Sequence, residues 1–237
     1  SVNAGTTLYL PQLLKSVYDS GSAYTWSTGV AVMSLDGTTA NVTMTYKSGD
    51  GSVYTESATA TPMASFDQRY SSALSGLSSF YGVGTLTADK PIVATINAAS
   101  NYDANRGLRG ASYRAFPNAA AGTRVFLPAL SKNATDPATG VQWSTGVAGQ
   151  LVGNSSTTVT LTYYLANGAT IQRSQSVSPS FPGINFDPRF DSGLADGTVA
   201  SGVLTTNPAQ PIVAAVSYAT GSTTLGDACM YYEGIGQ

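Results

Sequence analysis

Histidine is absent from this chain of 237 residues, and cysteine occurs once, at Cys229. Without histidine there is no Ser–His–Asp or Cys–His catalytic arrangement, no imidazole switch near neutral pH and no zinc site of the usual kind. One cysteine cannot form a disulfide within the chain. Cys229 is therefore expected to be a half-buried structural thiol, and a bridge between molecules is the alternative.

Charged residues are also scarce. Asp, Glu, Lys and Arg make up 10% of the chain, where about 25% is usual. The net charge is −2 and there is no run of Lys or Arg, so the chain lacks the basic surface that nucleic acid binding requires. No stretch approaches the roughly 18–20 apolar residues of a membrane span. A surface so poor in charge suits a protein packed among neighbours.

The carboxylates do not suggest an active site. The 13 Asp and Glu residues form no recognisable acid–base pair, and the DSG motif at 191–193 has no second copy to make an aspartic-protease dyad. The stretch YDANRG (102–107) has a loose calcium-like spacing but lacks the later glutamate of a calcium loop. The sequence thus predicts no enzyme, no cofactor and no metal.

What the chain does contain is a repeat. The phrase YTWSTGVAVM (24–33) returns as VQWSTGVAGQ (141–150), 117 positions later. The second copy then has three extra residues at 181–183, and the offset becomes 120 for FDQRY and FDPRF and for KPIVATI and QPIVAAV. Because the match covers nearly the whole chain, it indicates a tandem duplication with domains at 1–117 and 118–237.

Apolar residues within each copy recur with a period of two, as in NVTMTYK (41–47), and this is the pattern of half-buried strands. Asp50-Gly51 and Asn167-Gly168 lie at equivalent places between such runs and predict tight hairpin turns. Short strands separated by frequent turns predict an all-β protein made of two immunoglobulin-like β-sandwiches. Trp26 and Trp143 begin equivalent strands, so both are expected to be buried in the cores.

The motifs LPxL, WSTGV, TVTxTYY…NG, QPIVA and a closing YxG[FI] resemble tandem β-sandwich repeats in secreted surface proteins of filamentous, often thermophilic, bacteria. The residues that carry the resemblance are Pro11, Trp26, Gly29, Pro91, Pro128, Trp143, Gly146 and Pro211. The resemblance implies an extracellular structural or adhesive module, and it brings no catalytic residues with it.

Two kinds of site other than an active site are suggested. The FDxR loops place Asp67 near Arg69 and Asp187 near Arg189, and their presence in both copies favours a structural loop clamp over a ligand site. Glycosylation sequons occur at three asparagines, of which the second and third are the better loop candidates: Asn41, Asn133 and Asn154.

The ends of the chain suggest a joint between molecules. Five residues (117–121) separate the closing motif of copy one from the opening motif of copy two, and six would separate them across two molecules placed end to end. A contact between molecules that copies the contact between domains would build a filament. The residues expected at this joint, with strand 6–10 adding to a neighbouring sheet, are Thr6, Thr7, Leu8, Tyr9, Leu10, Tyr232, Glu233, Gly234 and Ile235.

The chain begins SVNAGTTLYL without Met, and we interpret this as a mature end left by a signal peptide, although a shortened chain would begin in the same way. We therefore expect an extracellular, cell-surface protein. The favoured function is a structural subunit of a filament, sheath or surface layer whose partner is itself, head to tail. The alternative is an adhesive module that binds surface glycans.

Overall fold

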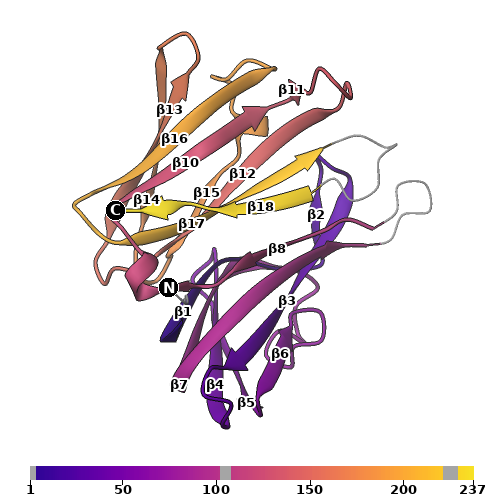
Figure 1. Ribbon diagram of the computed structural model, residues 1–237, viewed down its shortest axis with the longest axis vertical. Helices are drawn as coiled ribbons and strands as arrows, with labels where there is room; N and C mark the ends of the chain where they lie inside the picture. The colour runs from indigo at the N-terminus through magenta and orange to yellow at the C-terminus, as the bar shows by residue number, and fades with distance from the viewer. Residues whose placement is uncertain (1–3, 102–107, 221–228) are drawn as a thin grey trace.

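The computed structural model describes residues 4–101, 108–220 and 229–237 (Figure 1). Over these ranges the regular structure is β-strand apart from two single turns of 3-10 helix, and the strands form three antiparallel sheets. The prediction of an all-β protein is therefore confirmed. None of the described helical turns has the length or apolar character needed to cross a membrane.

The strands fall into two groups along the chain. Those of the first half are β1 (Gly5–Lys15), β2 (Val17–Asp19), β3 (Tyr24–Ser34), β4 (Ala40–Ser48), β5 (Val53–Ala60), β6 (Met63–Asp67), β7 (Phe80–Ser100), β8 (Gly110–Arg114) and β9 (Phe116–Pro117). Those of the second half are β10 (Arg124–Lys132), β11 (Ala134–Thr135), β12 (Gln142–Leu151), β13 (Thr157–Leu165), β14 (Thr170–Val177), β15 (Gly183–Phe186), β16 (Thr198–Asn207), β17 (Ile212–Thr220), β18 (Cys229–Glu233) and β19 (Ile235–Gly236). The short helices are η1 (Asn118–Ala120) and η2 (Pro188–Phe190).

Local sequence explains the hairpins. In β4 the side chains of Val42, Met44 and Tyr46 are buried while the residues between them are more exposed, so the period of two places one face in the core. Gly51 (φ 86°) and Gly168 (φ 83°) provide the left-handed backbone conformation in the turns that follow β4 and β13. The Asp-Gly and Asn-Gly turns were predicted from the sequence at these positions.

Each half consists of two layers. In the first half, layer A1 contains β5, β4, the first part of β7, β1 and β9, and layer B1 contains β6, β2, β3, the second part of β7 and β8. The long strand β7 runs through both layers and joins them into one sheet. In the second half, layer A2 is the sheet β14-β13-β16-β10-β19, and layer B2 is the sheet of β11, β12, β15, β17 and β18. Apolar side chains from both layers fill a core in each half.

The first strand of each half carries the same irregularity. The register of β1 shifts between Leu10 and Leu13, and the register of β10 shifts between Leu127 and Leu130. A tyrosine closes each bulge: the Tyr113 hydroxyl donates to the Gln12 carbonyl (2.7 Å) and the Tyr232 hydroxyl to the Ala129 carbonyl (2.5 Å). Each hydroxyl also accepts from the amide of the same bulge residue.

Strand registers refine the sequence alignment of the halves. Leu10 lies opposite Gly84, and Leu127 lies opposite Gly202, so β16 follows β7 at an offset of 118 rather than 120. The offset returns to 120 at the second Pro-Ile-Val stretch, because Pro208 and the residue after it lengthen the second half between β16 and β17. From here on, positions are called equivalent when they have the same strand partners in the two halves.

The two tryptophans differ. Trp26 is 8% exposed and packs with Leu14, Tyr24 and Ala98 in a small cluster at one end of the first half. Trp143 is only half-buried and contacts Tyr218, so the expectation that both rings are buried holds for Trp26 alone. The Trp26 cluster is completed by Cys229 and Tyr231 of the second half, and this contribution explains the difference.

We predict that Trp26→Ala lowers the free energy of unfolding by about 3–5 kcal/mol, because the substitution leaves a cavity in a buried cluster. Trp143→Ala should cost clearly less, since that ring keeps part of its contact with water. Urea unfolding followed by circular dichroism measures both. Equal losses for the two variants would contradict the assignment of Trp26 to a core position.

Candidate assembly interface

The two halves are packed directly against each other (Figure 1), through β1 of layer A1 and strands β12, β15 and β17 of layer B2. Strand β17 shows how this works. Ile212, Ala214 and Val216 belong to the core of the second half, whereas Val213 and Ala215 belong to the core of the first. Because successive side chains of a strand point to opposite faces, the outer face of layer B2 lies on layer A1.

Polar side chains bridge the same contact. The amide nitrogen of Gln150, a residue only 2% exposed, donates to the Thr85 hydroxyl at 3.2 Å. The Lys47 ammonium donates to the Pro179 carbonyl at 2.7 Å. The Tyr231 hydroxyl donates to the Gln12 side-chain oxygen at 2.8 Å. These bonds fix the position of one layer on the other, since buried polar groups need partners.

An ion cluster closes one end of the interface. Arg189 forms a two-pronged pair with Asp187, and its remaining nitrogen reaches Asp19 of the first half at 2.8 Å. Burial acts to raise the pKa of Asp19, but the bond and charge of Arg189, together with bonds from Ser22 and the Gly21 amide, outweigh it and hold that pKa below its ordinary value. The cluster ties residues that are 170 positions apart in the chain.

A second ion pair lies where β8 and β18 run side by side (Figure 1). The Arg114 guanidinium and backbone amide both donate to the Glu233 carboxylate. Burial acts to raise the pKa of Glu233, and the bonds from Arg114 lower it further than burial raises it. With the Arg189 cluster, this pair makes the interface between halves specific as well as apolar.

The FDxR loops have matching local geometry. The Asp67 carboxylate accepts bonds from the backbone amide and side chain of Arg69, and Asp187 accepts the same set from Arg189. They differ in what lies beyond: Arg189 also bonds Asp19, whereas the Arg69 side chain is 53% exposed. The sequence pointed to the local pairs but gave no sign of the bond to Asp19.

Of the residues expected at a joint between molecules, two are buried in a core, and the others are half-buried or exposed. Leu8 and Leu10 have no exposed surface. Their strand, which also contains Thr6, Thr7 and Tyr9, pairs with β7 on one side. On its other side it pairs with β9 at Leu8 and Tyr9. This strand is therefore not free to add to a neighbouring sheet, which corrects that expectation. Near the C-terminus, Tyr232 and Glu233 make the bonds described above. Gly234 lies against Val125. Ile235 is 62% exposed on the edge strand β19.

The three sequons lie in different surroundings. The amide nitrogen of Asn41 donates to Asp89 (2.8 Å) and that of Asn133 to Asp196 (3.0 Å), so both are engaged by carboxylates. Asn154 lies exposed in the turn between β12 and β13, and its oxygen accepts from Ser155. Asn41 and Asn154 are both exposed, and among the bonds described Asn154 is the one without a carboxylate partner. The calcium-like stretch at 102–107 lies outside the described residues.

A cavity of about 290 Å³ lies between the halves, with Trp26, Tyr81, Arg189 and Tyr231 in its lining. Arg189 and Tyr231 also form bonds of the interface described above. Within the described ranges, no three His, Cys, Asp or Glu side chains gather closely enough to hold a metal ion. Among the described residues, the most extensive set of apolar contacts, hydrogen bonds and ion pairs outside the two cores is the contact between the halves.

Comparison with known proteins gives little further information. No protein-family model matches the chain, and no curated protein matches it. Among solved structures, the crystal structure of Thermotoga maritima 1070 is similar to 49% of this chain and 95% of its own, at 14% identity and a TM-score of 0.36. Likeness at this level does not bear on function.

We predict that Asp19→Asn lowers the free energy of unfolding at pH 7 by about 1.5–3 kcal/mol, the usual value of hydrogen bonds to a charged group. The pKa of Asp19 is lowered from 3.8 in the folded protein, so its stabilising effect is complete above pH 3.8 and is lost as the pH falls through the lower folded value. The difference between wild type and variant should therefore vanish in acid. Urea unfolding at pH 7 and at successively lower pH measures it.

The matched control is Asp136→Asn. Asp136 follows β11 as Asp19 ends β2, and it closes a similar turn, accepting from the Ala138 amide at 3.1 Å. Its carboxylate has no arginine partner among the bonds described within the molecule. An equal loss of stability for both variants in dilute solution would mean that the Arg189 bond contributes nothing.

Proposed function

We propose that this protein is a structural subunit of an extracellular filament, sheath or surface layer, and that it assembles head to tail with copies of itself. The observation that carries the proposal is the unlike contact between the halves: layer A1 lies on layer B2. An interface between two different faces does not close on itself unless its rotation makes a ring, so its repetition produces a fibre.

We further infer that the halves, 1–117 and 118–237, are immunoglobulin-like β-sandwiches derived from one duplicated unit. The equivalent bulges, the tyrosines that close them and the paired FDxR loops support this inference. If the halves share one ancestral unit, the contact between them is a contact between two copies of that unit. The same contact between molecules then requires no new kind of surface.

The scarcity of charge agrees with an assembled protein. At 10% charged residues, the surface has little electrostatic repulsion to keep copies apart. The proposal assigns no enzymatic activity, cofactor, nucleic acid or membrane span. A glycan-binding adhesive module is the second candidate, and the cavity lined by Trp26, Tyr81 and Tyr231 is the observation that favours it.

We expect the purified protein to form polymers whose length grows with concentration, because every added copy presents the same free face. Sedimentation velocity over a concentration series and negative-stain images measure this. A protein that stays monomeric at high concentration and binds a glycan in an array would favour the adhesive module and contradict the structural proposal.

A further inference from the structure

We propose that the joint between molecules is formed by two faces that the contact between halves leaves open: the outer face of layer A2 in one molecule and the outer face of layer B1 in the next. This inference rests on the proposed function and names its interface. It places the joint on sheet faces rather than on terminal strands.

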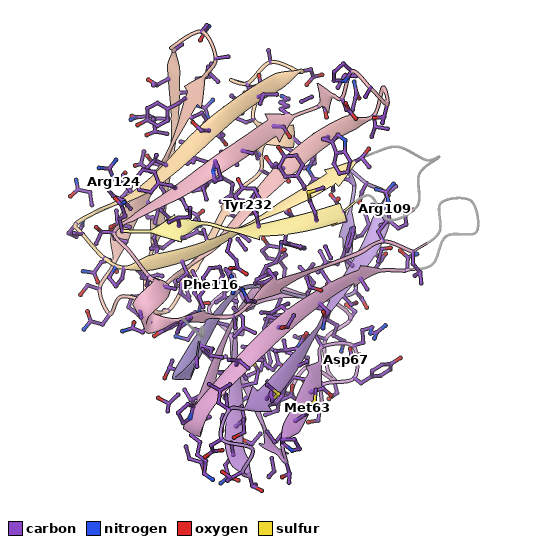
Figure 2. All side chains as sticks on the ribbon, in the orientation of Figure 1. Met63, Asp67, Arg109, Phe116, Arg124 and Tyr232 are labelled. Carbon is purple, nitrogen blue, oxygen red and sulfur yellow. The ribbon has the colours of Figure 1, made fainter. Side chains whose placement is uncertain are left out.

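The outer face of layer B1 carries an uncovered apolar row. Val93, Met33 and Met63 lie side by side on neighbouring strands, and Met33 and Met63 are 42% and 61% exposed. Met63 lies in the lower part of Figure 2, away from the strands of the second half. Residues directly opposite each other in a sheet share a face, so the three form one patch.

The equivalent row in layer B2 is covered. Val213, Gln150 and Gly183 have the same pairing, and Val213 and Gln150 are 1% and 2% exposed because layer A1 lies on them. The outer face of layer B1 is thus the same surface without its cover. Large exposed apolar patches on soluble proteins commonly mark interaction sites.

The outer face of layer A2 supplies the matching cover. Phe126, which is half-buried, lies opposite Val203, which is 8% exposed, as Tyr9 lies opposite Thr85 in layer A1. Tyr164 and Val199 extend this surface, and they are 45% and 58% exposed. These side chains come from β10, β13 and β16, the equivalents of the strands that carry layer A1 onto layer B2.

The two faces differ from their covered equivalents in a coordinated way. Inside the molecule, Thr85 and Gln150 form a polar pair. The equivalent positions of the proposed joint are Val203 and Met33, and both are apolar. A polar pair replaced on both sides by an apolar pair keeps the contact complementary, whereas a change on one side would bury an unpaired polar group.

Bulk is coordinated as well. Gly183 lies against Val83, since a side chain at position 183 would begin 3.5 Å from the valine methyl. The positions that would meet at the joint are Met63 and Ser201, where the large residue is on layer B1 and the small one on layer A2. The large and the small residue therefore exchange sides between the two contacts, and the pair at the joint is the larger of the two.

Charge follows the same rule. The bond from Arg189 to Asp19 closes one end of the contact between halves. The equivalent residues are Arg69, in the half that supplies layer B1, and Asp136, after β11 in the half that supplies layer A2, so a head-to-tail joint brings opposite charges together. Arg69 is already held by Asp67 and 53% exposed, in the orientation that Arg189 has beside Asp187.

The test uses one variant on each face. Met63→Glu places a charge on the outer face of layer B1, and Tyr164→Glu does so on the outer face of layer A2. Both residues are exposed, so both variants should fold, as circular dichroism will check. Val53→Glu is the control, because Val53 is 55% exposed on β5 and belongs to neither face.

We expect the wild type and Val53→Glu to polymerise, and Met63→Glu and Tyr164→Glu to remain monomers when each is alone. An equal mixture of the two monomeric variants should give dimers and nothing longer, because each variant keeps one intact face and the two intact faces are complementary. Sedimentation velocity resolves monomer, dimer and polymer.

The results of this experiment distinguish a failure of the proposed joint from a failure of the proposed function. Polymers of Met63→Glu or Tyr164→Glu, or a mixture that stays monomeric, would overturn the joint while the polymerising wild type still supported a structural subunit. A wild type that never polymerises would overturn the proposed function and the joint with it. Loss of polymerisation in Val53→Glu would show that any added surface charge prevents assembly, and would also overturn the assignment.

Discussion

The burial of layer B2 on both of its faces is the constraint on which the rest of the molecule depends. Strand β17 sends Ile212, Ala214 and Val216 into one core and Val213 and Ala215 into the other. A strand covered on both faces becomes a continuous apolar run. The two halves consequently share apolar side chains and form a single body rather than two domains on a flexible linker.

The sequence predicted the strands, the turns at Gly51 and Gly168 and the local pairing of Asp67 with Arg69, because each depends on residues close together in the chain. It could not predict the bond from Arg189 to Asp19, since nothing local relates residues 170 positions apart. Nor could it predict that Trp143 is half-buried. The burial of each tryptophan depends on whether residues of the other half pack against it, and the two equivalent positions differ in this respect.

Differences between the halves are therefore as informative as their similarity. Gln150 is polar where Met33 is apolar, although both have the same strand partners. Gln150 is buried and bonded to Thr85, and a methionine there would leave the threonine hydroxyl without that donor. Met33 faces outward, where an apolar residue contributes to stability only if something covers it.

The rigid contact within the molecule also constrains the geometry of a polymer. If layer A2 docks on layer B1 as A1 docks on B2, the same rotation and shift relate every half to the next, whether or not a peptide bond joins them. Each half then has nearly the same surroundings, and the polymer has a repeat of one half rather than one molecule. The peptide connection through η1 fixes only alternate joints, so side chains such as Met63, Tyr164 and Arg69 must hold the others.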